Sequence, residues 1–179
     1  MRQALNVVLG AAAIIVAIAL VWTYFGASAG ARFGGGPSTL AGAPAVSYPA
    51  TRLDGSTDGL DRYRGKVVVL NLWATWCGPC RSETPALERL YEEERSRGLV
   101  VLGVDQGESV KVAAAFAREM HLTYPILVDE QQRYGGAYAA VGLPTTVVVD
   151  RRGRIVVGHD GEWTLADFRQ AVGPALRAQ

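Results

Sequence analysis

The feature that most constrains this chain is a pair of cysteines, Cys77 and Cys80, at the point where a predicted buried strand gives way to a predicted helix. The strand, 66–73 (KVVVLNLW), is rich in β-branched residues and apolar on both faces, as a central strand requires. The helix, 79–97, repeats apolar residues at helical spacing and meets Gly98, which favours a helix end. We therefore expect an α/β fold with the cysteines at one end of its sheet.

The rest of the chain from residue 48 alternates predicted strands and helices, with turn residues between them. Further strands are expected in a short hairpin (50–53 and around 59–60, split by Asp54-Gly55), at 99–104 and 124–128, and in a second hairpin (145–150 and 154–158). Further helices are expected at 109–120 with an apolar stripe of Val112, Phe116 and Met120, at 131–141, and at 165–176 with Thr164 as N-cap. This order predicts a mixed sheet covered by helices on both faces.

The placement of the cysteines carries chemistry. The first turn of a helix has backbone N–H groups without partners and a partial positive charge, so the pKa of Cys77 should fall below the usual value of about 8.5. Cys80 lies one turn further on, where its sulfur can reach that of Cys77 and resolve a mixed disulfide. Pro79 fits the first helical turn, and Gly78 permits close approach of a substrate. The pattern predicts thiol–disulfide exchange.

Two other uses of the cysteines are weaker. A zinc site needs four ligands, and beyond the cysteines the chain offers only His121 and His159, without finger-like spacing. A purely structural disulfide between residues three apart closes too small a loop to stabilise the fold much. We expect no metal and no cofactor beyond the redox-active Cys77–Cys80 pair.

The amino terminus has the pattern of a membrane anchor. Residues 7–25 form an almost unbroken apolar run without charge, of about the 20 residues that a helix needs to cross a bilayer, and Arg2 favours a cytoplasmic amino terminus. The small residues 27–29 leave cleavage by signal peptidase open. We expect a signal-anchor over 1–25, a flexible linker rich in Gly, Ala and Pro over 26–47, and one domain over 48–179. The domain would then lie outside the cytoplasm.

The composition disfavours one broad class of partner. The chain has a formal net charge of +1, and its acidic and basic residues are mixed along the sequence. Without a basic stripe, nucleic-acid binding is disfavoured. We expect a monomer.

The segment 71–85 (NLWATWCGPCRSETP) resembles the thioredoxin superfamily, and within it the membrane-anchored TlpA and ResA type, which is related to the cytochrome c maturation reductases. The match runs from about Ala50 to the end. It implies a thioredoxin fold: a mixed central sheet flanked by helices, here with an N-terminal β-hairpin extension and preceded by one transmembrane helix. In this family a proline opposite the dithiol takes a cis peptide bond, and Pro144 in 142–146 (GLPTT) is the candidate.

The resemblance also suggests roles for neighbouring residues. Glu83 occupies the position of an active-site glutamate, where it could accept the proton of Cys80; the alternative is a glutamate favoured only by the helix dipole. Asn71 stands where thioredoxin has a buried aspartate, and an amide cannot shuttle protons. Trp73 is expected in the core. Residues expected to contact the substrate are Trp76, Gly78, Pro79, Leu143, Pro144 and Thr145.

These features predict an extracytoplasmic reductase of protein disulfides, with apocytochrome c as a candidate substrate and a membrane electron donor of the CcdA or DsbD type. The dipeptide Gly78-Pro79 is that of general thioredoxins, which implies a couple nearer about −270 mV than the about −120 mV of a strong oxidant. Two alternatives remain open. One is a thiol peroxidase, and the other is a copper chaperone or assembly scaffold with His159 as the additional ligand.

Overall fold

A computed structural model of the protein describes residues 40–178. The expected anchor over 1–25 and the cleavage pattern at 27–29 lie outside these residues. Within the described part, no helix combines the length and the apolar character needed to cross a membrane.

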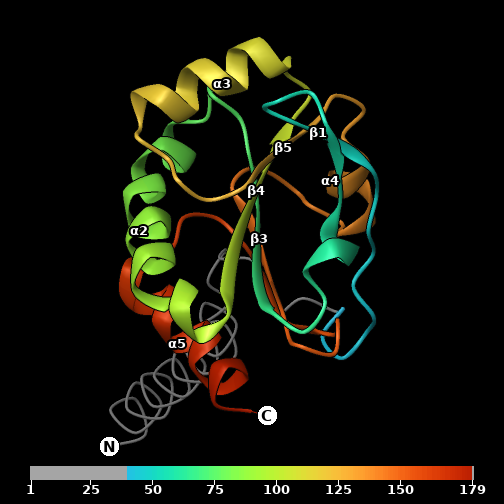
Figure 1. Cartoon of the computed structure of the whole chain (residues 1–179), viewed down its shortest axis with the longest axis vertical. Coiled ribbons are helices and arrows are strands. Elements are labelled where there is room, and N and C mark those ends of the chain that lie inside the picture. Colours follow the sequence, from blue (N-terminus) through green and yellow to red (C-terminus); the bar gives the residue numbers. More distant parts are fainter. Residues whose placement is uncertain (1–39, 179) are drawn as a thin grey trace, which may run out of the picture. The chain divides into compact units, whose positions relative to one another are not determined.

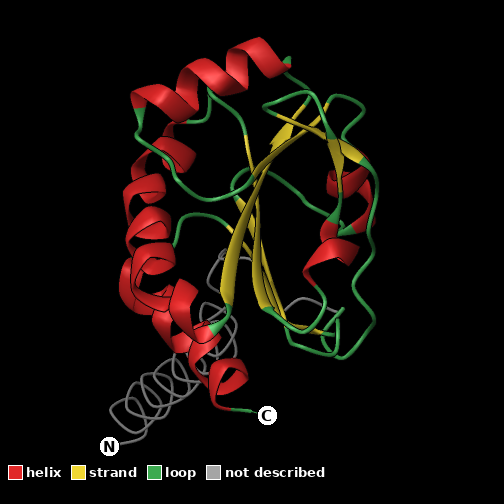
Figure 2. Cartoon of the chain, in the orientation of Figure 1, coloured by secondary structure: helices red, strands yellow, loops and turns green. Residues whose placement is uncertain are grey.

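One sheet, drawn in yellow in Figure 2, forms the centre of the domain. It has seven strands in the order β2-β1-β5-β4-β3-β6-β7. β3 pairs in parallel with β4, and β4 with β5, whereas β6 runs antiparallel to β3. The sheet is therefore mixed, as predicted. Its strands are β1 (Ala50–Arg52), β2 (Thr57–Asp58), β3 (Val67–Trp73), β4 (Leu99–Gln106), β5 (Ile126–Asp129), β6 (Thr145–Val149) and β7 (Ile155–Asp160).

Helices cover both faces of the sheet, as expected, but unequally (Figure 1). One face packs against α2 (Gly78–Glu94), α3 (Val110–Glu119) and α5 (Leu165–Arg177). The other face packs against the short α4 (Arg133–Ala137) and the 3₁₀ helix η1 (Leu60–Tyr63). A second 3₁₀ helix, η2 (Arg95–Arg97), follows α2 and ends at Gly98, whose φ of 89° lies in the left-handed region that glycine tolerates.

The central strand explains how the cysteine pair is held. Every residue of β3 is buried, so both of its faces contribute to the core. Leu87 and Leu90 of α2 are fully buried against the face of β3 that carries Val67 and Val69. Burying side chains of this size is worth about 1.5–3 kcal/mol each, which fixes α2, and therefore Cys77 at its start, against the end of β3.

Three local predictions need correction. The second strand of the first hairpin is Thr57–Asp58 instead of the region around 59–60, because Leu60 already begins η1. The helix expected over 131–141 spans only 133–137, and Ala139 beyond it has a left-handed φ of 50°. Val112 is 41% exposed, since α3 turns Ala113, Phe116 and Ala117 towards the core instead.

The end of the expected linker packs onto the domain. The Gly42 N–H donates to the Ile155 carbonyl and the Ala45 N–H to the Gly153 carbonyl, each at 2.8 Å. The Tyr138 hydroxyl donates to the Val46 carbonyl at 2.7 Å. Residues 42–46 therefore belong to the folded part, although their Gly- and Ala-rich sequence is typical of a tether.

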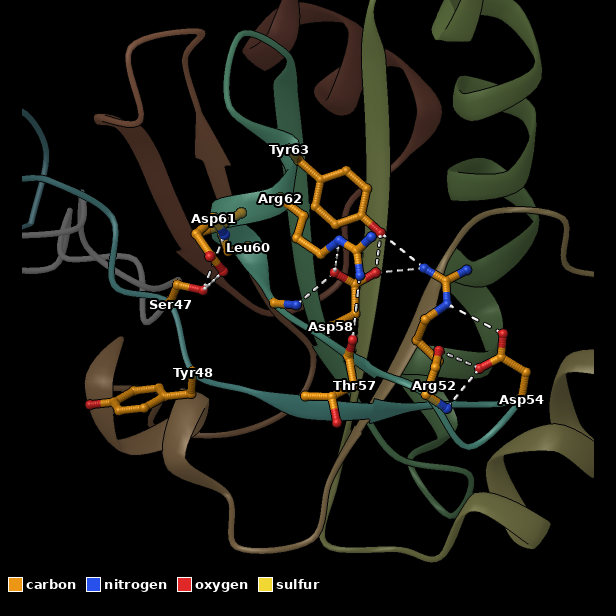
Figure 3. A network of polar contacts seen from close by, with 12 residues as sticks. Ser47, Tyr48, Arg52, Asp54, Thr57, Asp58, Leu60, Asp61, Arg62 and Tyr63 are labelled. Atoms are coloured by element: carbon orange, nitrogen blue, oxygen red, sulfur yellow. Dashed lines mark hydrogen bonds and ion pairs between the residues drawn. The ribbon is translucent and has the colours of Figure 1, made fainter.

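A polar network fastens the N-terminal hairpin beside η1 (Figure 3). The buried carboxylate of Asp58 accepts hydrogen bonds from Arg52 at 2.6 Å and from the Tyr63 hydroxyl at 3.0 Å. Its second oxygen accepts the Gly59 N–H at 2.7 Å. A buried carboxylate needs this degree of pairing, so the network fixes the turn from β2 into η1.

Candidate active site

Cys77 and Cys80 form a disulfide across the first turn of α2, with their Cα atoms 5.3 Å apart. Cys77 is the N-cap residue, and its Sγ accepts the backbone N–H of Cys80 at 3.2 Å. In this oxidised state Cys77 is only 4% exposed and Cys80 is buried. A helix N-terminus with an N–H directed at the sulfur stabilises negative charge, so this geometry favours a Cys77 thiolate once the bond is reduced.

The two tryptophans beside the cysteines divide as expected. Trp73 is buried and stacks on Phe116 with ring centroids 4.7 Å apart. Trp76 is 72% exposed and directly precedes Cys77. Trp73 is therefore a core residue, and Trp76 is available to an incoming molecule.

The peptide bond between Leu143 and Pro144 is cis, as the resemblance implied. The Pro144 carbonyl accepts the Gly161 N–H at 2.8 Å, and the Thr145 hydroxyl donates to Asp160 at 2.5 Å. These contacts tie the start of β6 and the loop before it to the end of β7 and the residue that follows it.

A groove lies between Leu143 of this loop and Trp76, the residue before Cys77. It brings Trp76 together with Leu143, although the two are far apart in sequence. Its other walls are mostly small or amide side chains, so a polypeptide backbone can approach closely. They are Gln106, Gln132, Gly135, Gly136, Ala139, Ala140 and Gly142.

Glu83 is a buried group and more than a helix-dipole partner. It is 1% exposed, and its two carboxylate oxygens accept the Asn71 side-chain N–H at 2.7 Å and the Trp163 backbone N–H at 3.0 Å. Burial raises its pKa to about 7, and these hydrogen bonds only partly offset that rise. Among residues 40–178, no hydrogen bond joins Glu83 to either cysteine.

Sequence reasoning missed two acidic residues behind the active-site loop. Asp105, at the end of β4, is fully buried, and Glu108 binds Thr75, two residues before Cys77. The signal that the sequence offered for Asp105 was an acidic residue at the end of a predicted buried strand, which the structure pairs with Trp73.

The His159 ring stacks on Trp163 with ring centroids 5.0 Å apart. No group of three or more His, Cys, Asp or Glu in residues 40–178 is placed to hold a metal ion.

A mixed sheet, a disulfide at the N-terminus of the helix that follows its central strand, and a cis proline before β6 define a thioredoxin-fold protein with a redox-active cysteine pair. Comparison with known proteins then gives the family. A model of the AhpC/TSA family matches residues 41–157, and the chain belongs to that family.

The relatives agree on the chemistry. The thiol-disulfide oxidoreductase ResA of Geobacillus thermodenitrificans is 36% identical over 129 residues, which cover 72% of this chain and 74% of that protein. A thiol:disulfide interchange protein of Chlorobium tepidum superposes with a TM-score of 0.67 at 30% identity, covering 74% of this chain and 95% of that one. A secreted thiol-disulfide isomerase of Corynebacterium glutamicum superposes with a TM-score of 0.69 at 28% identity, and the match covers 75% of this chain and 86% of that one. The chain is a ResA-like thiol-disulfide oxidoreductase.

Proposed function

We propose that this protein reduces disulfides of other proteins outside the cytoplasm, with Cys77 as the attacking sulfur and Cys80 as the resolving one. The observation that carries the proposal is the Cys77 sulfur at the N-cap of α2, within 3.2 Å of the Cys80 N–H and bonded to the Cys80 sulfur. One sulfur is held where a thiolate is stabilised, and the other is held within bonding reach of it.

The reaction balances as two exchanges. The Cys77 thiolate attacks one sulfur of the substrate disulfide, which forms a mixed disulfide and releases the first substrate thiolate. Cys80 then loses its proton and attacks the Cys77 sulfur, which releases the second substrate thiolate. Two electrons pass to the substrate, and the protein is left with the Cys77–Cys80 disulfide.

Glu83 is the group we assign to the proton of Cys80. Its pKa of about 7 lies between that of an ordinary carboxyl and that of a thiol, so it can both take up and release a proton near neutral pH. It lies one turn after Cys80 on α2 and is shielded from solvent. Asn71, which donates to it, cannot carry a proton itself.

The groove beside the dithiol is the surface we assign to the substrate chain. Trp76 supplies an exposed aromatic wall, and Leu143 supplies an apolar contact next to Pro144. Gly78 and Pro79, at the start of α2, and Thr145, at the start of β6, complete the expected contact set. A small-residue floor suits an extended backbone better than a bulky ligand.

The sequence and the relatives support the cellular setting that we propose. The apolar run 7–25 supports a membrane anchor with the domain on the extracytoplasmic side, and one structural neighbour is described as secreted. We propose apocytochrome c as a substrate and a CcdA- or DsbD-type membrane protein as the electron donor. A reducing role outside the cytoplasm needs such a donor, because that compartment is oxidising.

The test is to trap partners. Cys80→Ser leaves the attacking sulfur without its resolving partner, so it should accumulate mixed disulfides in native membranes, and mass spectrometry then identifies the proteins held. Cys77→Ser is the matched control and should trap none. In parallel, wild-type protein should reduce insulin disulfides, and either variant should lose that turnover. Normal turnover by Cys77→Ser would overturn the assignment.

A second measurement fixes the direction. Equilibration with glutathione buffers gives the potential of the Cys77–Cys80 couple, which we expect nearer about −270 mV than about −120 mV. A value near the upper figure would make the protein an oxidant instead.

A further inference from the structure

The loop that carries the attacking cysteine is held by one carboxylate. Thr75 lies between β3 and α2, and its backbone N–H donates to one oxygen of Glu108 at 2.7 Å. Its hydroxyl donates to the other oxygen of Glu108, also at 2.7 Å. Both oxygens of Glu108 are therefore committed to a single loop residue. Charge-assisted contacts of this kind are stronger than neutral ones and fix geometry.

Glu108 is held in turn by Asp105. The Asp105 side chain is fully buried, and its Oδ1 accepts the Glu108 backbone N–H at 3.0 Å. Its Oδ2 is buried and accepts no hydrogen bond within residues 40–178. A buried, ionised carboxylate oxygen without a hydrogen bond would destabilise the folded protein, whereas a protonated one could donate to Glu108. The orphaned oxygen is thus the position that we assign to a proton.

The surroundings favour one proton on this pair. The cross-strand neighbours of Asp105 are Trp73 on β3 and Val128 on β5, which do not titrate, and the charge that faces it is Glu108. Burial, followed by the side chain of Glu108, raises the pKa of Asp105 to about 8, although the Glu108 backbone N–H at Oδ1 opposes that rise. Burial alone would raise the pKa of Glu108, but its hydrogen bonds with Asp105 and Thr75 outweigh this and lower it. Near neutral pH, Asp105 is neutral and Glu108 is charged.

We propose that Asp105 and Glu108 are positioning residues for the exchange reaction: protonated Asp105 holds ionised Glu108, which fixes Thr75 and so sets the loop that presents Trp76 and Cys77. The proposal rests on the proposed function for its substrate-side consequence. Trp76 follows Thr75 directly and lines the groove together with Gln106, which follows Asp105. Loosening Thr75 would therefore disturb the groove wall, whereas the Cys77 sulfur would still be held at the N-cap of α2 by the Cys80 N–H.

Glu108→Gln is the first test, because the amide keeps one acceptor oxygen for the Thr75 N–H but removes the negative charge that strengthens the contacts with Thr75. In the full chain, the Thr75 amide should exchange with deuterium about tenfold faster, and the rate of reducing a protein disulfide should fall about tenfold, the effect of losing one charged hydrogen bond. The rate with the small disulfide 5,5′-dithiobis(2-nitrobenzoate) should change less than about twofold, because it needs only the sulfur. A merely structural defect would move both rates together.

The chain supplies a matched control. Glu88 accepts the Thr123 N–H at 2.8 Å and the Thr123 hydroxyl, the same two-point contact at an exposed site. Glu88→Gln should therefore speed exchange at Thr123 and leave the Thr75 amide and both rates unchanged.

Asp105→Asn tests the proton. The asparagine amide can donate to Glu108 as the protonated acid does, so this variant should keep the slow Thr75 exchange and the protein-disulfide rate. In wild type, protection of the Thr75 amide, corrected for intrinsic exchange at each pH, should fall above about pH 8 as Asp105 ionises, and in Asp105→Asn it should not. Cys77 also titrates after reduction, so the exchange comparison is made on oxidised protein.

Two results would overturn the proposal. One is unchanged Thr75 exchange and an unchanged ratio of the two rates in Glu108→Gln. The other is Asp105→Asn behaving like Glu108→Gln, which would mean that Asp105 acts as an ionised carboxylate. If wild type reduces no protein disulfide, the proposed function fails, and the amide-exchange comparison still decides the role of the pair.

Discussion

The side chain of Asn71 donates a hydrogen bond of 2.7 Å to Glu83, which joins the central strand to α2, the helix that Cys77 caps. The same Asn71 amide donates to the Thr146 hydroxyl at 3.1 Å, so β3, β6 and α2 meet at one buried polar point. The Trp163 backbone N–H donates to the second carboxylate oxygen of Glu83. A proton gained or lost by Glu83 therefore alters contacts in several elements around the dithiol.

The first prediction concerns pH and stability. The pKa of Glu83 is raised from 4.5 to about 7 in the folded protein, so the folded state holds its proton more tightly than the unfolded state does. Stability from this group is fully present below pH 4.5 and is lost as pH rises to about 7, by up to about 3 kcal/mol. Urea unfolding of oxidised wild type and Glu83→Gln across this range measures it. Parallel pH curves for the two proteins would contradict the raised pKa.

The second prediction concerns the exposed aromatic wall of the groove. Trp76→Ala should slow reduction of a protein disulfide by about tenfold, as expected of an exposed aromatic anchor, while the small-disulfide rate and the unfolding midpoint stay nearly constant. Val112→Ala removes another exposed apolar side chain, on α3, and serves as the control. Equal rates for Trp76→Ala and wild type with protein substrates would remove Trp76 from the binding surface.

The third prediction concerns the network that fastens the N-terminal hairpin. Asp58→Ala leaves Arg52 and the Gly59 N–H without their acceptor and should cost about 2–3 kcal/mol of unfolding free energy. Asp54→Ala, at an exposed position beside Arg52, should cost far less. Insulin reduction per folded molecule should be unchanged in both. Equal losses of stability would show that the network contributes nothing beyond the surface pair.

The fourth prediction concerns where the folded part begins. A chain starting at residue 48 loses the backbone hydrogen bonds of Gly42 to Ile155, at the start of β7, and of Ala45 to Gly153, in the turn before it. Its melting temperature should lie roughly 5–10 °C below that of a chain starting at residue 40. Calorimetry of both chains checks this. Identical melting curves would return residues 40–47 to the linker.

Much of the fold follows from local patterns. Three elements were predicted from a few neighbouring residues each, and all three are present in the structure. The signals were the β-branched run of β3, the helical spacing of apolar residues in α2 and the Thr164 cap of α5. The capping box between Thr164 and Asp167 shows how complete such a local signal can be. Boundaries moved by one residue in β3 and α5, whereas α2 ends three residues before the predicted 97, because residues 95–97 form the 3₁₀ helix η2.

What escaped prediction depends on distant partners. The composition of residues 42–46 is typical of a tether, yet two of their backbone N–H groups donate to the carbonyls of Gly153 and Ile155, more than 100 residues later. In the site, the cysteines were evident from their spacing, but the burial of Glu83 depends on Asn71 and Trp163. The contact of Glu108 with Thr75 crosses from one strand end to the next and leaves no periodic trace.

The most direct measurement is the reactivity of each thiol in the reduced full chain, followed by mass-mapped alkylation as a function of pH. Because the Cys77 sulfur sits at the N-cap with a backbone N–H directed at it, we predict that Cys77 titrates below about 8.5, is alkylated faster than Cys80, and pairs with Cys80 on mild oxidation. If neither thiol is more acidic than free cysteine, and mild oxidation forms no disulfide between them, the assignment of this site to thiol–disulfide exchange is wrong.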